Sequence, residues 1–449
     1  MEEKTQQPGK GLGKALRLCA LILAVVLIWQ IVAPSMLEFA RALSREEDVS
    51  SETQQTEPSL PDTAEGLYEL ATTAIGQEDY DTALLRLADT RKMLENSDTP
   101  GDLQLLSQAW LMEASIHILK GDFPRAREAL EASLKADPTQ GQALLLRAQL
   151  SIDGGDYKTA IADVDSYLET NPTDTATRQT YAQLLEQAQQ YEAAAAEYET
   201  LYQQNPDDES YRLNALRCLF LVGSYQEAIN GFDDYISRLP EGEADPYGGI
   251  ADFLRAACLL QLEDYAAAIT GFQQAEKAGY DRAACLEQIG LCQFESGDYE
   301  GVLTTGDTMF AIEDGQIAMP ELAYQRLGIA AMYLEDYQKA LDNMDRAEAL
   351  EPGLEGNAYY RGVCLLALGR SQEAIQAFTD SIDQGYLPQF GYYNRGVCQV
   401  ELEDYEKALA DMEMTLTSGQ DPDLIAAAQE LQAQLTDYLE QQETQQTEA

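Results

Sequence analysis

The sequence has a single histidine, His117, and few basic residues, with 29 lysines and arginines against 78 aspartates and glutamates. One histidine leaves no basis for a catalytic triad or a histidine-ligated metal site. The net charge of −49 excludes nucleic-acid binding, which needs basic side chains to displace counterions from phosphates. No Cys-x-x-Cys, His-Glu-x-x-His or glycine-rich phosphate loop occurs. The sequence therefore predicts no enzyme, no cofactor and no metal site.

The negative charge is concentrated after the first 45 residues. Those 45 residues contain six basic and three acidic side chains, so residues 46–449 carry 23 basic and 75 acidic ones, a net charge of −52. Such a charge alone would suit a disordered acidic chain. However, 45% of the residues are hydrophobic, including 25 tyrosines and 10 phenylalanines, which predicts a folded body with a core.

An uncharged run of 20 residues, 18–37, predicts a transmembrane signal-anchor helix, because 20 residues span about 30 Å of bilayer. Four basic residues precede the run and only two follow it closely. The positive-inside rule then places residues 1–17 in the cytoplasm and the rest outside. We therefore expect a single-pass protein of the cell membrane with an extracytoplasmic body. A cleaved signal peptide is the alternative, although Pro34 lies next to the best cleavage site.

Residues 38–62 predict a flexible acidic stalk, because they are rich in serine, threonine, glutamine and glutamate and have little to bury. A flexible segment of about 25 residues has a root-mean-square reach near 27 Å. The stalk would hold the body close to the membrane without contact.

A repeat of 34 residues dominates the remaining sequence. An acidic or small residue, an aromatic residue and, three places later, an alanine recur, as in Asp156, Tyr157 and Ala160. Six of the nine intervals between successive turn positions equal 34. Apolar residues recur at three- and four-residue steps on both sides of this turn. Each unit is therefore predicted to be an antiparallel pair of helices that must stack on its neighbours to bury its apolar face.

These features resemble the tetratricopeptide repeat (TPR). The turn aromatic, the following alanine, the terminal proline and a small residue eight places into the units all fit; that last group comprises Ala148, Ala182, Ala256, Gly290, Gly328, Gly362 and Gly396. The resemblance implies an all-α fold, a right-handed α-solenoid of about ten helix pairs at 64–422. A capping helix is expected at 423–440 and a disordered tail at 441–449.

Two sets of side chains have structural interpretations. Five of the seven cysteines fall ten residues into their units, which predicts buried free thiols rather than disulfides. Arg147 and Arg395 each have an aspartate 16 residues later, Asp163 and Asp411, and we predict an ion pair within each unit. Arg255 and Arg361 occupy the same place without that aspartate.

The resemblance also implies a binding groove. In this family the first helices of the units line a concave surface, with positions two, five, nine, twelve and thirteen facing it. Carried over to the late units, these positions give a partner-binding stripe: Phe294, Met332, Tyr333, Tyr359, Val363, Leu366, Phe390, Tyr393 and Val397. The alternative is that some of these residues pack in the core or under the C-terminal helix.

The sequence therefore predicts a membrane-anchored scaffold that binds a protein or peptide partner in the bacterial cell envelope. Two alternatives stay open. One is a cytosol-facing receptor or adaptor, and the other is a non-catalytic subunit of a membrane or cell-wall enzyme complex. The identity of the partner and the oligomeric state do not follow from the sequence.

Overall fold

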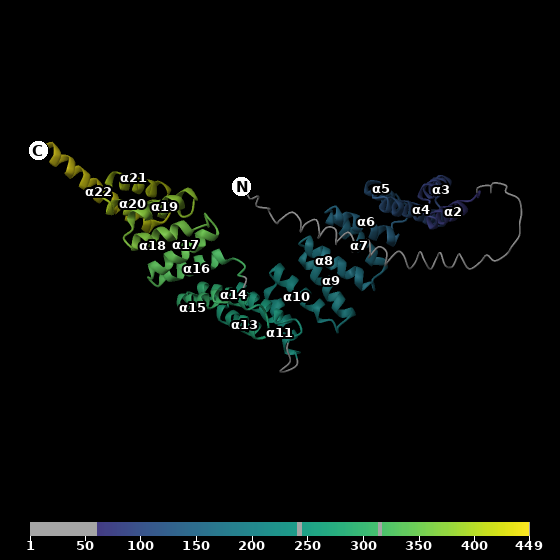
Figure 1. Cartoon of the computed structure of the whole chain (residues 1–449), viewed down its shortest axis with the longest axis horizontal. Coiled ribbons are helices and arrows are strands. Elements are labelled where there is room, and N and C mark those ends of the chain that lie inside the picture. Colours follow the sequence, from purple (N-terminus) through teal and green to yellow (C-terminus); the bar gives the residue numbers. More distant parts are fainter. Residues whose placement is uncertain (1–60, 240–244, 313–316, 449) are drawn as a thin grey trace, which may run out of the picture. The chain divides into compact units, whose positions relative to one another are not determined.

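The structure is a computed structural model that describes residues 61–239, 245–312 and 317–448. Within these ranges the chain is all-α, with 21 helices and no strand, and it divides into two compact units, Met1–Thr177 and Arg178–Ala449 (Figure 1). The predicted membrane helix at 18–37 and almost all of the predicted stalk lie outside the described residues. None of the helices that the structure describes is long and apolar enough to cross a membrane.

The first unit holds three helix pairs. They are α2 (Ala64–Gly76) and α3 (Tyr80–Leu94), α4 (Pro100–Leu119) and α5 (Phe123–Ala136), α6 (Gly141–Asp153) and α7 (Tyr157–Thr170). Helix α8 (Thr175–Gln187) begins at the end of this unit and continues into the second.

The second unit continues the alternation. Its helices are α9 (Tyr191–Gln204), α10 (Glu209–Val222), α11 (Tyr225–Ser237), α12 (Ile250–Gln261), α13 (Tyr265–Lys277), α14 (Arg282–Glu295), α15 (Tyr299–Phe310), α16 (Pro320–Tyr333), α17 (Tyr337–Leu350), α18 (Asn357–Ala367), α19 (Ser371–Asp383), α20 (Pro388–Glu401), α21 (Tyr405–Ser418) and α22 (Pro422–Glu448). The even-numbered helices are the first helices of their pairs. Counting α8 with α9, the described residues contain ten pairs followed by α22.

The turn inside each pair has a local cause in the sequence. A residue with positive φ ends the first helix, and it is a glycine in five pairs and a glutamate or glutamine in the other five. In six pairs the next residue is an aspartate whose carboxylate accepts a hydrogen bond from the main-chain N–H three residues on, for example Asp298 from Gly301 at 3.0 Å. This aspartate caps the second helix, so the repeated acidic residue has a structural function.

The small residues of the repeat let the two helices of a pair approach closely. A Cβ atom added to Gly362 would lie 2.6 Å from Phe378, and one added to Gly396 would lie 2.4 Å from Met412. In both pairs the facing side chain comes 16 residues later and is fully buried. A large buried side chain on the second helix therefore fills the space that the glycine leaves on the first.

In the second unit, the first helices of successive pairs also pack against one another. Contacts join α10 to α12, α12 to α14, α14 to α16, α16 to α18, α18 to α20 and α20 to α22. Each first helix also packs against the second helix of the preceding pair. The first helices therefore form a continuous layer, and side chains on their outer face can form one surface.

Helix α22 packs on α20 and α21, in the place that the first helix of another pair would take. Leu424, Ala428 and Leu435 are buried on its inner side. The sequence predicted a helix at 423–440 and a disordered tail at 441–449, whereas the structure continues the helix to Glu448. The reason is compositional, because the stretch is rich in glutamine and glutamate and has no glycine or proline to end a helix.

Candidate functional site

The nine residues of the predicted partner-binding stripe lie on the first helices α14, α16, α18 and α20 of the second unit. None of them is fully buried. Tyr333 is 58% exposed, and the other eight are half-buried. Several also pack at their inner edge against the core, since Met332 and Val363 touch the cluster around Phe378. The stripe residues therefore lie at the edge of the core and remain partly in contact with solvent.

Aromatic rings join α14 to α16. Tyr299, the turn aromatic that begins α15, packs edge-on against Phe294 with ring centroids 6.1 Å apart. Its other side stacks on Tyr333 with centroids 4.5 Å apart and an angle of 2° between the rings. The three rings form a ladder from α14 to α16. Because Tyr333 ends this ladder largely exposed, it presents a flat apolar surface to solvent.

A second aromatic group surrounds Tyr359 on α18. Its ring lies 5.5 Å from Tyr360, 6.0 Å from Phe378 and 6.2 Å from Tyr386, centroid to centroid. The Tyr359 hydroxyl accepts a hydrogen bond of 3.4 Å from the side-chain amide of Asn394 on α20. Burial raises the pKa of Tyr359, so the phenol stays protonated near neutral pH. This part of the stripe is therefore uncharged.

A cavity of about 310 Å³ lies between α20 and α22. Two predicted stripe residues, Tyr393 and Val397, line it from α20. The rest of its lining is Val400 on α20 together with Ala427, Glu430, Leu431 and Gln434 on α22. Its volume suits one large side chain, and its lining is mixed, with Glu430 and Gln434 as polar groups beside the apolar ones. The capping helix therefore adds a wall to the stripe.

Two contributors to this surface were not predicted. Tyr299 belongs to the set of turn aromatics, which the sequence pattern used only to mark the repeat. The apolar residues of α22 were assigned only to capping. The contribution of α22 could have been expected, because α22 takes the place of another first helix. Its outward-facing residues therefore extend the same surface.

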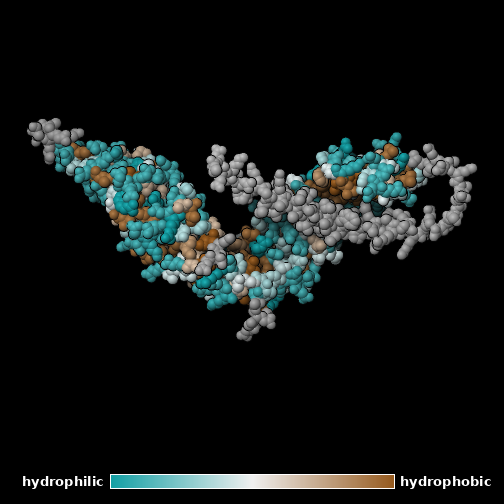
Figure 2. Space-filling view, viewed as in Figure 1, coloured by the Kyte–Doolittle hydropathy of each residue, from teal (hydrophilic) through white to brown (hydrophobic). Residues whose placement is uncertain are grey.

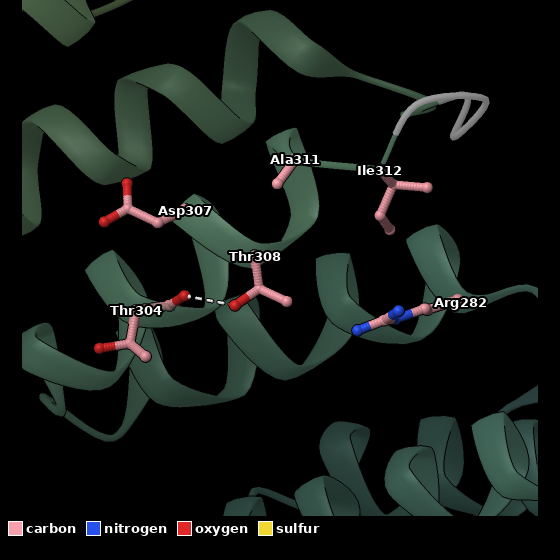
Figure 3. Close-up of a pocket in the computed structure, with 6 residues that line it drawn as sticks. All are labelled: Arg282, Thr304, Asp307, Thr308, Ala311 and Ile312. Atoms are coloured by element: carbon pink, nitrogen blue, oxygen red, sulfur yellow. Dashed lines mark hydrogen bonds between the residues drawn. The ribbon is translucent and has the colours of Figure 1, made fainter.

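A larger hollow of about 770 Å³ is lined mainly by helix α15, the second helix of its pair, and by Arg282 at the start of α14. Figure 3 shows its lining side chains, with the Thr308 hydroxyl donating to the main-chain oxygen of Thr304 at 3.0 Å. Both charged residues already have partners, since Arg282 pairs with Glu276 at 3.0 Å and Asp307 lies 3.8 Å from Lys339. This arrangement offers no free group for binding.

The cysteines offer no nucleophile. All six in the described ranges are buried and unpaired, including the five for which the repeat position predicted this. Burial raises the pKa of the Cys258 and Cys364 thiols to about 12. The thiolate, which is the reactive form, is therefore scarce at neutral pH. No group of three or more histidine, cysteine or acidic residues in the described part of the chain could hold a metal ion.

The surface around the stripe is mostly hydrophilic. Figure 2 shows a face of the molecule that is mostly teal, with scattered brown, apolar patches. Several ion pairs among the described residues join neighbouring helices and have one well-exposed partner. With so few basic residues, most acidic side chains have no cation beside them. An apolar stripe in an acidic surround favours a partner that is apolar and neutral or basic.

Comparison with known families gives a consistent result. Residues 111–175 and 326–385 match a family model described as tetratricopeptide repeat, and residues 151–216 match a second model with the same description. No curated protein sequence matches the chain.

Several solved structures are similar to this chain. A structure of Naa15/Naa10 bound to HypK-THB shares 12% identity at a TM-score of 0.46, and the alignment covers 82% of this chain and 66% of that one, just under two thirds. The C-terminal part of a TPR repeat-containing protein from Cytophaga hutchinsonii shares 16% identity at a TM-score of 0.46, covering 55% and 98%. A tetratricopeptide repeat protein from Parabacteroides merdae shares 18% identity at a TM-score of 0.30, covering 60% and 98%.

Proposed function

The chain carries tetratricopeptide repeats, and on this premise we propose that it is a non-enzymatic scaffold that binds a protein or peptide partner along the stripe on α14, α16, α18 and α20. The observation that carries the proposal is the exposure of aromatic and aliphatic side chains on a continuous layer of first helices. Tyr333 is 58% exposed although its ring is large and apolar. Such side chains dominate the binding energy of protein interfaces once a partner covers them.

The proposal includes location. The uncharged run at 18–37 anchors the chain in the cell membrane, and the basic residues before it hold the N-terminus in the cytoplasm. The repeats then lie on the outer side of the membrane, and the partner is a component of the bacterial cell envelope. The run of 20 uncharged residues and the asymmetry of its flanking charges support this arrangement.

Labelling of a single engineered cysteine tests the location. Lys277 is exposed at the end of α13, and the described native thiols are buried, so Lys277→Cys gives one reactive site on the repeats. An impermeant maleimide should label this variant on intact spheroplasts, and the protein should stay in the membrane after a carbonate wash. Labelling only after lysis would show that the repeats face the cytosol, and release by the wash would contradict the anchor.

Crosslinking tests the stripe. The full chain and its Tyr333→Ala variant would be crosslinked in membranes and purified, and the captured proteins compared. Loss of a protein from the Tyr333→Ala sample is expected, since the variant removes the exposed end of the ring ladder. Leu350→Ala is a matched control, because Leu350 is 52% exposed in the same unit but lies at the end of α17, a second helix. Equal capture by all three proteins would refute binding at the stripe.

A further inference from the structure

The turns inside the pairs of the second unit repeat one short sequence that the fold explains only in part. Leu-Glu-Asp-Tyr occurs three times, at 262–265, 334–337 and 402–405. The tyrosine is the half-buried turn aromatic, and the aspartate is the N-cap residue of the second helix. The leucine and the glutamate are exposed in all three turns. Exposed apolar residues that recur at one place on the surface suit binding rather than packing.

Three exposed leucines form a row across successive pairs. Leu334, Leu368 and Leu402 are the C-cap residues of α16, α18 and α20, and they are 39%, 36% and 44% exposed. Their main chains share one conformation, with φ of −88°, −85° and −95° and ψ of 9°, 4° and 8°. Because these helices pack on one another in order, the three side chains leave the surface at equivalent places. They form a leucine row with a spacing of about 8–10 Å, the usual distance between packed helices.

A carboxylate follows the leucine at each end of this leucine row. Glu335 and Glu403 both have φ of 61°, a left-handed conformation that glycine adopts at less cost. The lysine four residues after each of them, Lys339 and Lys407, forms an ion pair with an aspartate instead. Among the described residues neither glutamate carboxylate forms an ion pair. Exposed carboxylates kept on a strained backbone without a structural partner suit the recognition of a cation.

The middle of the leucine row is neutral. Gly369 takes the place of the glutamate there, with φ of 69°. The next residue, Arg370, holds Glu373 through two hydrogen bonds of 2.8 and 2.7 Å, so its charge is already compensated. The leucine row therefore presents three apolar side chains with a free carboxylate beside the first and the last. These two carboxylates are two helix spacings apart, or about 16–20 Å.

The spacing of the leucine row selects the conformation of a ligand. Residues seven apart in an α-helix lie on one side of it and about 10.5 Å apart along its axis, close to the spacing of the leucines. In an extended chain the residues on one side are about 6.6 or 13 Å apart, and neither distance fits. We propose that the leucine row binds an amphipathic helix of a partner protein, which crosses α16, α18 and α20 with apolar residues at seven-residue intervals and with lysine or arginine beside Glu335 and Glu403. The leucine row contains no residue of the stripe, so it is a second site beyond the proposed function.

The charge of the chain favours a basic helix over the other surfaces that could cover the leucine row. Residues 46–449 carry a net charge of −52. That charge repels a second copy of the chain, and it also repels the anionic headgroups of a lipid surface. A basic helix is attracted to it, and its charges orient the helix before the apolar contacts form.

Binding of a designed helical peptide to the full chain in phosphatidylcholine nanodiscs tests the proposal. The fluorescent peptide has leucine at every seventh position, lysine on both sides of that stripe, and alanine and glutamine elsewhere. A peptide of the same composition in scrambled order is the control probe, and empty nanodiscs give the background. The variants are Leu368→Ser, the double variant Glu335→Gln with Glu403→Gln, and Tyr333→Ala in the stripe. Leu350→Ser is the matched control, because Leu350 is 52% exposed but lies at the end of a second helix.

We expect Leu368→Ser and the double variant each to weaken binding of the designed peptide about tenfold. Leu350→Ser and Tyr333→Ala should leave it unchanged, and the scrambled peptide should bind the wild type about tenfold more weakly. The double variant removes only exposed carboxylates, so its result holds even if Leu368→Ser lowers the melting temperature.

The outcomes separate this inference from the proposed function. If only Tyr333→Ala weakens binding, the helix binds at the stripe, so the leucine row is wrong and the proposed function stands. If the wild type binds neither peptide, or binds both equally, the leucine row is also wrong, and the crosslinking test of the stripe is unaffected. An environment-sensitive dye on Leu368→Cys, compared with the wild type treated with the same dye, reports on lipid. A shift of its emission to shorter wavelength before any peptide is added would show that the leucine row lies against the bilayer and would overturn the proposal.

Discussion

Arginines at the seventh place of the repeat unit form two kinds of ion pair that differ in the depth of the carboxylate. Arg147 holds Asp163 through two hydrogen bonds of 2.8 and 2.6 Å, and Arg395 holds Asp411 through two of 2.8 and 2.7 Å. These are the predicted pairs within a unit, and both aspartates are buried, at 2% and 4% exposure.

The other two arginines at this place pair with the preceding unit. Arg255 contacts Asp233 and Arg361 contacts Asp345, and both of these aspartates are about half exposed. No partner was predicted for them, because their aspartates precede the arginine and lie on the previous second helix. The position of the carboxylate relative to the arginine thus decides whether the pair is buried.

We predict that Arg395→Met destabilises the protein far more than Arg361→Met. Removing Arg395 leaves the buried Asp411 carboxylate without its cation, which costs about 3–5 kcal/mol. Removing Arg361 leaves an exposed aspartate in water, and such surface pairs contribute less than about 1 kcal/mol. Hydrogen exchange of the α20–α21 and α18–α19 amides would measure both effects locally. Equal loss of protection in the two variants would show that burial of the aspartate does not determine how much the ion pair contributes to stability.

The positive φ at the turn inside each pair is a second feature at residue scale. Gly297 has φ of +78°, and an added Cβ would meet nothing within 4 Å. Glu335 and Glu403 hold the same conformation, with φ of 61° in both. Turns with glutamate therefore retain a strained backbone that glycine would relieve.

We predict that Gly297→Ala lowers stability by about 1 kcal/mol, because the only cost is the left-handed backbone. Gly76→Ala is the matched control, since Gly76 lies in helix α2 with open space around it and a negative φ. That substitution should be neutral or stabilising, as alanine favours helix over glycine. Thermal unfolding followed by circular dichroism compares the two. A loss at Gly76 as large as that at Gly297 would contradict the argument.

At the scale of elements, local chemistry explains which parts the sequence could predict. The turns inside the pairs were predictable because the turn aromatic and the alanine three places later recur in the sequence, even where a glutamate or glutamine holds the positive φ. The stripe residues followed from repeat register, yet the stacking of Tyr299 on Tyr333 depends on the contact between successive pairs. The end of α22 was misplaced because its last eight residues have no stop signal.

We predict that removal of helix α22 destabilises the last helix pair. A chain that ends at Gly419 loses Leu424, Leu431 and Leu435 and exposes the apolar cluster around Met412. Each buried leucine contributes about 2 kcal/mol, so α20 and α21 should lose most of their protection and the protein should tend to associate. A chain that ends at Glu440 is the control, because residues 441–449 contain one apolar residue, the terminal Ala449.

Light scattering and hydrogen exchange would distinguish the two shortened chains. The Glu440 variant should match the full chain in both measurements. If it instead behaves like the Gly419 variant, the polar end of α22 has a stabilising contact that burial does not reveal. If the Gly419 variant stays monomeric and fully protected, α22 is no cap.

At the scale of the whole molecule, the net charge of −49 opposes the compact state through repulsion among acidic side chains. The basic residues are already used, since most of the described arginines form ion pairs with carboxylates. The remaining acidic side chains occur mainly on exposed helix faces and at turns. Added salt therefore has two opposite effects on stability. It weakens the stabilising ion pairs, and it screens the destabilising repulsion among acidic side chains.

We predict that screening of the repulsion dominates and that salt raises the melting temperature. Going from 10 mM to 0.15 M salt shortens the screening length from about 30 Å to about 8 Å, which removes repulsion between distant acids but leaves contacts of about 3 Å largely intact. A variant with Glu403, Glu406 and Glu413 replaced by glutamine should melt higher at low salt and gain less from added salt. Lys407→Gln is the opposite control, since it makes the charge more negative and should steepen the dependence. A melting temperature that falls as salt is added would contradict this prediction. It would show that the ion pairs of the few lysines and arginines stabilise the protein more than repulsion among the acidic side chains destabilises it.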